Sequence, residues 1–131
     1  MSGGEGFWSG RANLAGKRAL IAGGGGGLGK ACALDLGRAG VRLALCDRDE
    51  AALTRTATQL RDEIGADVIT AVLDVRDADA LGAFYAQADA AFGSALEVVV
   101  NVAGGTWFQA FADSAPKGWD TLVRTNYTWI L

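Results

Sequence analysis

The chain has 131 residues, half of them hydrophobic and 21% charged, with a formal net charge of −3. This size and composition predict a single globular domain and exclude a disordered chain, and the acidic balance argues against a nucleic-acid-binding surface. Histidine is absent and no apolar run is long enough to span a bilayer, so we expect a cytoplasmic protein with no metal site and no nucleic-acid or membrane partner.

The N-terminal segment differs in composition from the rest of the chain. Residues 1–13 are rich in glycine and contain a Phe7-Trp8 pair, but they lack the apolar segment of a signal peptide. We expect a flexible N-terminal arm over residues 1–13 and one domain over residues 14–131. The first element of that domain is a strand over residues 18–22, whose continuous apolarity is typical of a strand covered on both faces.

A glycine-rich stretch, residues 22–29, separates this strand from a helix that is predicted to stop at Gly40. Glycines allow a tight turn and a close backbone approach, and the N-terminus of the following helix attracts phosphate charge. Strand, glycine turn and helix in this order predict a dinucleotide-binding turn, although the glycine run is also compatible with a flexible loop. The inward face of the helix is predicted to contain Leu28, Cys32, Leu36 and Ala39.

The second strand, predicted over residues 41–46, ends at Asp47 and is followed by Arg48. A dinucleotide-binding fold places an acid roughly 20 residues after its first glycine, where it accepts hydrogen bonds from the adenosine ribose. The charge of Asp47 would repel a 2′-phosphate and favours NAD over NADP, whereas Arg48 could receive such a phosphate. Alternatively, Asp47 only caps the next helix, for which Asp49 is also suited. Cys32 and Cys46 are expected to be small core residues.

The next elements continue the alternation of strand and helix. Asp49 is expected to cap a helix that reaches Gly65, and Asp77 one that reaches Gly93, with a strand over residues 68–73 between them. The inward residues of the two helices recur at helical spacing. They are Leu53, Ala57, Leu60 and Ile64 in the first helix, and Leu81, Phe84, Ala88 and Phe92 in the second. The strand is followed by Asp74-Val75. The carboxylate of Asp74 either meets the adenine or is exposed to solvent in a turn.

The last predicted strand covers residues 96–102, and a loop with several aromatic residues follows it. Ser114 is expected to cap the last helix, with Pro116 in its first turn. The apolar face of that helix is predicted to contain Trp119, Leu122, Val123, Asn126 and Ile130. Four repeats of strand and helix predict an α/β fold, a doubly wound parallel sheet of the Rossmann type with three α/β/α layers, truncated after its fourth strand and the following helix.

Taken together, the glycine turn, the acid after the second strand, Asp74-Val75 and the segment 101–104 resemble the short-chain dehydrogenase/reductase family, from about residue 14 onward. The resemblance implies that the glycines form the coenzyme turn, Asp47 binds the ribose, Asp74-Val75 the adenine, and Asn101, Ala103 and Gly104 the floor under the coenzyme. The implied coenzyme site comprises Gly23, Gly27, Leu28, Gly29, Asp47, Arg48, Asp74, Val75, Asn101, Ala103 and Gly104. Asn126 matches the asparagine of the family's catalytic tetrad, which supports a proton-relay water and the catalytic lysine.

The resemblance also implies an activity, hydride transfer between NAD (NADP being less favoured) and an alcohol or ketone substrate. The family moves the proton with a serine and with a tyrosine that lies four residues before a lysine. No Tyr-x-x-x-Lys occurs in these residues, since Tyr85 precedes Asp89 and Tyr127 is followed by only four residues. We therefore expect the N-terminal part of a longer enzyme, inactive on its own, whose parent forms a dimer or tetramer.

Two positions depart from the family's motifs and are expected to weaken hydrogen bonding around the turn. Ala22 stands where the family usually has threonine, and Val102 replaces the second asparagine of the Asn-Asn-Ala-Gly element. Two other functions stay open, a non-catalytic nucleotide-binding or regulatory module and a Rossmann-type methyltransferase.

The C-terminal quarter of the chain is expected to leave apolar surface uncovered. Without a fifth strand, the fourth strand keeps a free edge. The side chains expected to be exposed there are Trp119, Trp129, Ile130 and Leu131. Trp107, Phe108 and Phe111 follow the coenzyme floor, which suggests either a bulky apolar substrate or ordinary loop packing.

Overall fold

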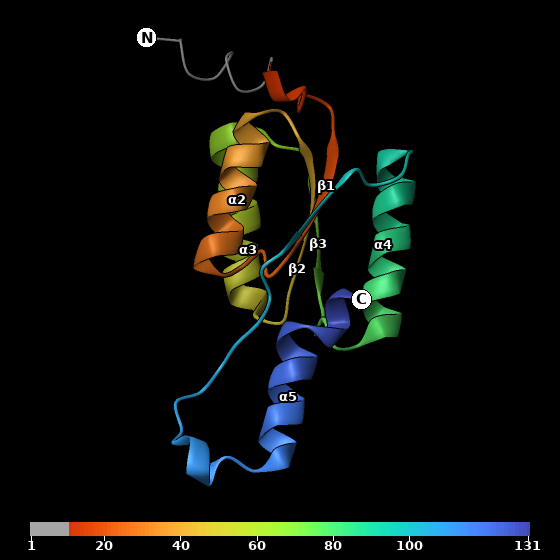
Figure 1. The fold of residues 1–131 in the computed structure, drawn as a ribbon. Coiled ribbons are helices and arrows are strands. Elements are labelled where there is room, and N and C mark those ends of the chain that lie inside the picture. Colours follow the sequence, from red (N-terminus) through yellow and green to blue (C-terminus); the bar gives the residue numbers. More distant parts are fainter. Residues whose placement is uncertain (1–10) are drawn as a thin grey trace.

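The computed structural model describes residues 11–131 and contains one parallel sheet (Figure 1). Its strands are β1 (Arg18–Ala22), β2 (Arg42–Asp47), β3 (Val68–Val72) and β4 (Val98–Asn101), arranged in the order β3-β2-β1-β4. In the centre of the sheet, Leu20 of β1 pairs with Ala44 of β2 and with Val99 of β4. Residues 1–10 of the predicted arm lie outside the described residues. In the rest of the arm, residues 11 and 12 are helical.

Helices cover both faces of the sheet. Helices α2 (Gly27–Arg38) and α3 (Glu50–Gln59) lie against one face and α4 (Ala78–Phe92) lies against the other, which makes three layers (Figure 1). Helix α5 (Pro116–Asn126) lies past the carboxyl ends of the strands. A π-helical turn, η1 (Leu60–Ile64), extends α3, and two 3₁₀ turns, η2 (Phe111–Asp113) and η3 (Thr128–Ile130), flank α5. The predicted doubly wound parallel fold is confirmed.

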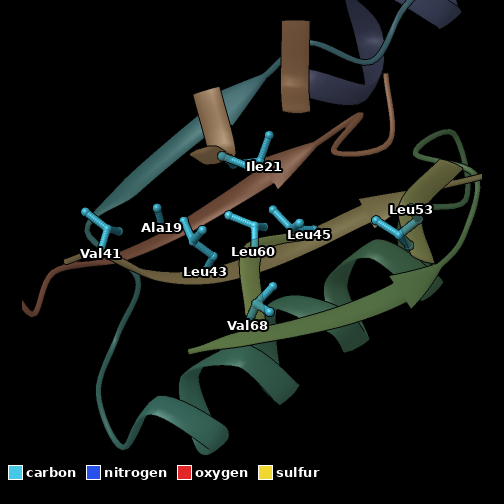
Figure 2. Close-up of a cluster of buried hydrophobic side chains, with 9 residues drawn as sticks. Ala19, Ile21, Val41, Leu43, Leu45, Leu53, Leu60 and Val68 are labelled. Atoms are coloured by element: carbon cyan, nitrogen blue, oxygen red, sulfur yellow. The ribbon is translucent and has the colours of Figure 1, made fainter. Parts of the chain in front are cut away.

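The core divides into two clusters because successive residues of a strand face opposite sides. Ala19 and Ile21 of β1 pack with α2 and α3, and Figure 2 shows this cluster around β1, β2 and β3. Leu20 and Ala22 pack on the opposite face against α4, whose buried residues are the predicted Leu81, Phe84, Ala88 and Phe92. Both faces of β1 are therefore buried, which explains its continuous apolarity.

The two cysteines lie in or against this core, as predicted, and both are free. Cys32 is half-buried, whereas Cys46 is fully buried in the cluster under α4. Burial raises the pKa of the Cys46 thiol to about 11, and the neighbouring Asp47 adds to the effect. The thiol therefore stays protonated at neutral pH and is a poor nucleophile. Within residues 11–131, no helix has both the length and the apolarity needed to cross a bilayer.

Local capping signals were correct for two helices and wrong for a third. The carboxylates of Asp49 and Asp77 accept hydrogen bonds from the N–H groups of Ala52 (2.9 Å) and Ala80 (3.0 Å). Ser114 does not cap α5, because its hydroxyl donates to the carbonyl of Ala110 (3.3 Å) and the N-cap is Ala115. Pro116 is the first helical residue, and this places the cap one position later than predicted.

The inward face of α2 agrees with the prediction in part, because Cys32 and Leu36 pack against the cluster around Ala19 and Ile21 but Leu28 does not. Leu28 is 67% exposed, whereas the buried residues are Gly29, Ala33 and Gly37, and Cys32 and Leu36 are only half-buried. Small residues let the helix axis approach the sheet closely, and this close approach decides the face. The helix stops before Gly40, which has φ +83°, as predicted.

The sheet ends at β4, which pairs only with β1 among the described strands. Trp119, Ile130 and Leu131 are exposed, as expected. Trp129 is not exposed, because it is half-buried against the cluster under α4 and its indole N–H donates to the carbonyl of Thr125 (2.9 Å). The 3₁₀ turn after α5 turns this side chain back toward the core.

Replacing Thr56 by valine is expected to raise the free energy of unfolding by about 1 kcal/mol. Thr56 is 1% exposed on α3, and its hydroxyl has no hydrogen-bond partner among residues 11–131. Removing that hydroxyl removes a desolvation cost that nothing offsets. Urea unfolding measures the change, with Thr58→Val as the control because Thr58 is exposed on the same helix. Equal effects of the two substitutions would contradict the explanation.

Candidate functional site

The glycine turn between β1 and α2 is fastened to the ends of both neighbouring strands. The N–H groups of Gly23 and Gly24 donate to the carbonyl of Cys46 at the end of β2 (2.8 and 3.0 Å). Gly23 has φ +92°, and a Cβ there would lie 2.8 Å from the backbone nitrogen of Ala103, just beyond β4. Only glycine therefore fits at this position. The turn holds the N-terminus of α2 at the carboxyl edge of the sheet.

A cleft of about 290 Å³ opens at this edge, between the glycine turn and the loops that follow β2, β3 and β4. The predicted coenzyme residues that line it are Gly23, Asp47, Arg48, Asp74, Val75, Ala103 and Gly104. Sequence reasoning did not select six further lining residues, which are Gly26, Leu73, Arg76, Val102, Gly105 and Thr125. Position alone could have indicated most of them, because each of the first five adjoins a predicted residue or belongs to the glycine run.

Five other predicted residues do not line this cleft. Gly27 and Leu28 are exposed in the first turn of α2, and Gly29 is buried beneath the glycine turn. Asn101 lines a separate hollow between β4, α4 and η3. Asn126 lines an adjacent hollow with Gly105 and Leu122. The structure thus brings together the residues that follow the strands, but not every residue of the motifs.

Asp47 bonds to the glycine turn and does not cap α3. Its Oδ2 accepts a hydrogen bond from the N–H of Gly25 (2.9 Å), and its Oδ1 accepts one from the N–H of Asp49 (3.0 Å). A carboxylate has about four acceptor positions, so roughly two stay open toward the cleft. The capping alternative is wrong, because Asp49 caps the helix. The carboxylate is thus positioned to accept hydrogen bonds from a ligand.

Asp74 forms an ion pair with Arg76 at the rim of the cleft. The Arg76 guanidinium contacts both carboxylate oxygens, and the backbone N–H of Arg76 donates to Oδ1 (2.9 Å). The side-chain bond, followed by the backbone bond, lowers the pKa of Asp74 to about 2. A lowered pKa stabilises the fold above the ordinary value of 3.8, and this contribution is lost as the pH falls toward 2. Asp74 therefore stays ionised at neutral pH.

Asn126 fastens helix α5 to the loop after β4. Its Oδ1 accepts from the N–H of Gly105 (2.9 Å), and its Nδ2 donates to the carbonyls of Gly105 (2.8 Å) and Leu122 (2.9 Å). Gly105 also lines the cleft, so this contact sets the position of one cleft wall. The amide of Asn126 is thereby fixed in orientation.

A model of the short chain dehydrogenase family matches residues 17–131. The chain belongs to the short-chain dehydrogenase family. The match covers the glycine turn, the strand ends and α5, and it confirms the resemblance predicted from the motifs. Membership of this family argues against the methyltransferase alternative.

Two curated relatives illustrate the match. The chain is 35% identical over 114 residues to the short chain dehydrogenase/reductase dpmpG of Macrophomina phaseolina, covering 87% of this chain and 65% of that protein. It is 35% identical over 121 residues to the rhamnolipids biosynthesis 3-oxoacyl-(acyl-carrier-protein) reductase of Pseudomonas aeruginosa, covering 88% of this chain and 44% of that protein. The chain thus spans less than two thirds of the length of either relative.

Solved structures agree with this fold. A short-chain type dehydrogenase/reductase from Mycobacterium marinum superposes with a TM-score of 0.83 at 30% identity, over 89% of this chain and 47% of that chain. An actinorhodin polyketide ketoreductase with NADPH superposes with a TM-score of 0.80 at 33% identity, over 87% of this chain and 43% of that chain. An NAD⁺-bound xylitol dehydrogenase superposes with a TM-score of 0.82 at 28% identity, over 88% of this chain and 44% of that chain.

The glycine turn is tied to the segment after β4 through the backbone at both positions that depart from the family's motifs. The N–H groups of Val102 and Ala103 donate to the carbonyl of Ala22 (3.0 and 2.9 Å). The expected weakening therefore does not leave the turn loose, because these bonds need no side chain at residue 22 or 102.

Replacing Gly104 by alanine is expected to displace the Asn126 side chain from Gly105 in the loop after β4. A Cβ at Gly104 would lie 2.5 Å from the Asn126 Oδ1, whereas one at Gly105 would meet nothing within 4 Å. In Gly104→Ala, the N–H of Gly105 should lose its hydrogen bond to Asn126, and hydrogen exchange at the Gly105 N–H should become about tenfold faster. Gly105→Ala is the control. It keeps the hydrogen bond from the N–H of residue 105 to Asn126, which contributes about 1 kcal/mol, so the exchange rate of that N–H should stay within about twofold of the wild-type rate. Similar rates in both variants would contradict the role of Asn126.

Proposed function

We propose that this chain is the coenzyme-binding half of an NAD(P)-dependent short-chain oxidoreductase, which transfers hydride between a nicotinamide coenzyme and an alcohol or ketone. The observation that carries the proposal is the Asp47 carboxylate, which lines the cleft and is fixed by the N–H of Gly25 in the glycine turn. A carboxylate at that place accepts hydrogen bonds from ribose hydroxyls. In our proposal, residues 14–131 form the incomplete dinucleotide-binding domain.

The residues of the cleft fit a dinucleotide. Gly23 lets the backbone at Val102 and Ala103 pack against the turn more closely than any side chain would allow, and α2 begins at the uncapped Gly26, which leaves N–H groups for the pyrophosphate. Asp47 would hold the ribose, Asp74 and Val75 the adenine, and Ala103 and Gly104 the far side of the coenzyme. Gly27, Leu28 and Gly29 would support the turn. The coenzyme itself supplies or accepts the hydride when it is bound.

NAD is the coenzyme that we favour. The charge of Asp47 opposes a 2′-phosphate, whereas the charge of Asp74 is balanced by its ion pair with Arg76 on the same cleft. Arg48 also lines the cleft and is the residue that could receive a 2′-phosphate. Related structures hold NADPH in the ketoreductase and NAD⁺ in the xylitol dehydrogenase, so the family accommodates both coenzymes. Comparing the dissociation constants of NADH and NADPH decides between them.

We propose for Asn126 the supporting role of the family's tetrad asparagine, with its amide held by Gly105. Tyr85 is not a substitute for the catalytic tyrosine, because burial raises its pKa, which is opposite to the change that proton transfer near neutral pH needs. The parent enzyme is proposed to act as a dimer or tetramer, and a cytoplasmic location stays a prediction from composition.

Titration of the chain with NADH, followed by coenzyme fluorescence, tests the proposed function. We expect saturable binding of NADH that is tighter than binding of NADPH, and no competition by S-adenosylmethionine. If NADH does not bind at millimolar concentration to a chain with the circular dichroism of a folded α/β protein, the proposal is wrong. Tighter binding of S-adenosylmethionine would restore the methyltransferase hypothesis.

The 131 residues alone are expected to show no dehydrogenase turnover, because they contain no Tyr-x-x-x-Lys pair to move the proton. The measurement is NADH formation at 340 nm with a panel of primary, secondary and ring-bearing alcohols. The dehydrogenase from Mycobacterium marinum is a suitable reference protein for the assay. Oxidation of any alcohol above the rate of a protein-free blank would contradict this prediction.

A further inference from the structure

An aromatic hollow lies in the loop between β4 and α5, outside the cleft proposed for the coenzyme. Its volume is about 360 Å³. Its lining residues are Trp107, Gln109, Phe111, Ser114, Trp119 and Leu122. The lining contains three aromatic rings and no charged side chain. This chemistry suits an uncharged, apolar guest.

The walls of this aromatic hollow are held in place by contacts within the chain. The rings of Phe111 and Trp119 stack with their centroids 5.6 Å apart and their planes 14° apart. The Trp107 ring lies over Gly118, where a Cβ would come within 3.2 Å of its Cζ2. The indole N–H of Trp107 donates to the Gln109 Oε1 (3.1 Å). The rings therefore keep their positions without a partner.

The aromatic hollow neighbours the coenzyme cleft by way of a middle hollow that shares a lining residue with each of them. Gly105 lines both the cleft and this middle hollow, and Leu122 lines both that middle hollow and the aromatic one. The middle hollow is also lined by Asn126, the residue that matches the family's catalytic asparagine. A molecule whose reacting group lies near Asn126 could therefore extend toward Trp107 and Trp119.

We propose that the aromatic hollow binds the ring-bearing part of the substrate, so that the substrates are aryl or other flat ring-bearing ketones and the corresponding alcohols. The inference rests on the proposed function. Stacked and edge-on ring contacts favour flat apolar groups beyond the gain from buried area alone. Short aliphatic carbonyl compounds lack the surface to use these contacts, and charged acyl groups would be desolvated without a partner.

Titration of the 131-residue chain with 2-acetonaphthone tests the proposal, with the indole N–H signals observed by ¹⁵N NMR. Each signal is assigned with a single Trp→Phe variant. We expect the signals of Trp107 and Trp119 to shift saturably, while the signal of Trp129, which lies against the cluster under α4, stays in place. 2-Butanone at the same concentration should shift none of them. If the Trp107 and Trp119 signals instead shift when the protein concentration is raised and do not respond to the ketone, the hollow is a contact with a second copy of the chain and the proposal is overturned.

A matched pair of phenylalanine substitutions locates the binding. Phe111 lines the hollow, whereas Phe108 is fully exposed and does not line it. Phe111→Ala should weaken 2-acetonaphthone binding about tenfold through the lost ring contact and buried area, and Phe108→Ala should change it less than about twofold. Equal effects would overturn the proposal. NADH titration of the same samples separates the two hypotheses, because NADH binding without any ketone response overturns only the substrate class.

Discussion

Replacing Gly29 by alanine is expected to lower the free energy of unfolding by about 3 kcal/mol, the upper end for overpacking a rigid site. Gly29 is buried in the first turn of α2, and a Cβ there would overlap the carbonyl oxygen of Gly23. The obstructing atom belongs to the backbone of the glycine turn, which is itself bonded to Cys46 and packed against Ala103. Relief would therefore require the whole turn to move.

Gly27→Ala is the matched control for this substitution. Gly27 lies two residues earlier on the same helix, is exposed, and has open space where the methyl group of an alanine would lie. Alanine there should stabilise the chain by about 0.5 kcal/mol, because it restricts the unfolded state and favours the helix. Urea unfolding measures both variants, and NADH titration reports the turn. A Gly29→Ala variant as stable as Gly27→Ala would show that the turn is not rigid.

Replacing Asp47 by alanine is expected to weaken NADH binding by about 100-fold or more. Hydrogen bonds to a charged group contribute about 1.5–3 kcal/mol each, and the ribose would lose two of them. The variant also loses the acceptor for the Gly25 N–H, so the glycine turn is less well fixed. Preference for NADH over NADPH should fall as well, because the repulsion of a 2′-phosphate disappears.

Two further variants separate charge from geometry at this position. Asp47→Asn keeps an acceptor for Gly25 and removes the charge, so its affinity for NADH should lie between those of the wild type and Asp47→Ala. Asp49→Asn removes a charge two residues away but keeps a good helix cap and does not alter the cleft lining. Its affinity for NADH should stay within about threefold of wild type, since exposed charges are screened by salt. Unchanged binding in Asp47→Ala would refute the ribose assignment.

Much of the fold could be predicted because the signals are local. Asp49 and Asp77 cap the helices that follow them, and Gly65 and Gly93 end those helices in the left-handed conformation. The four inward residues of α4 were correct, since they recur at helical spacing along one face. Such features depend on residues within one or two turns of each other, so sequence order suffices to find them.

Apart from the cap of α5, the errors occurred where the outcome depended on contacts between elements. The face of α2 was predicted only in part, because its small residues, and not Leu28, approach the sheet most closely. Trp129 is half-buried because η3 turns it back against the cluster under α4. Periodicity contains no information about which neighbour a face meets.

The alternation of strands and helices, the glycine turn and the resemblance to the short-chain dehydrogenase family could all be predicted from the sequence. These follow from apolar patterns, from glycine's conformational range and from motif spacing, all of which are properties of the chain order. Only the tertiary structure decided that the Asp47 carboxylate meets the N–H of Gly25, that Asn126 holds Gly105, and that Gly29 lies beneath the turn. The first two contacts join segments far apart in the chain, and all three depend on the close packing of elements at the sheet edge, which chain order does not specify.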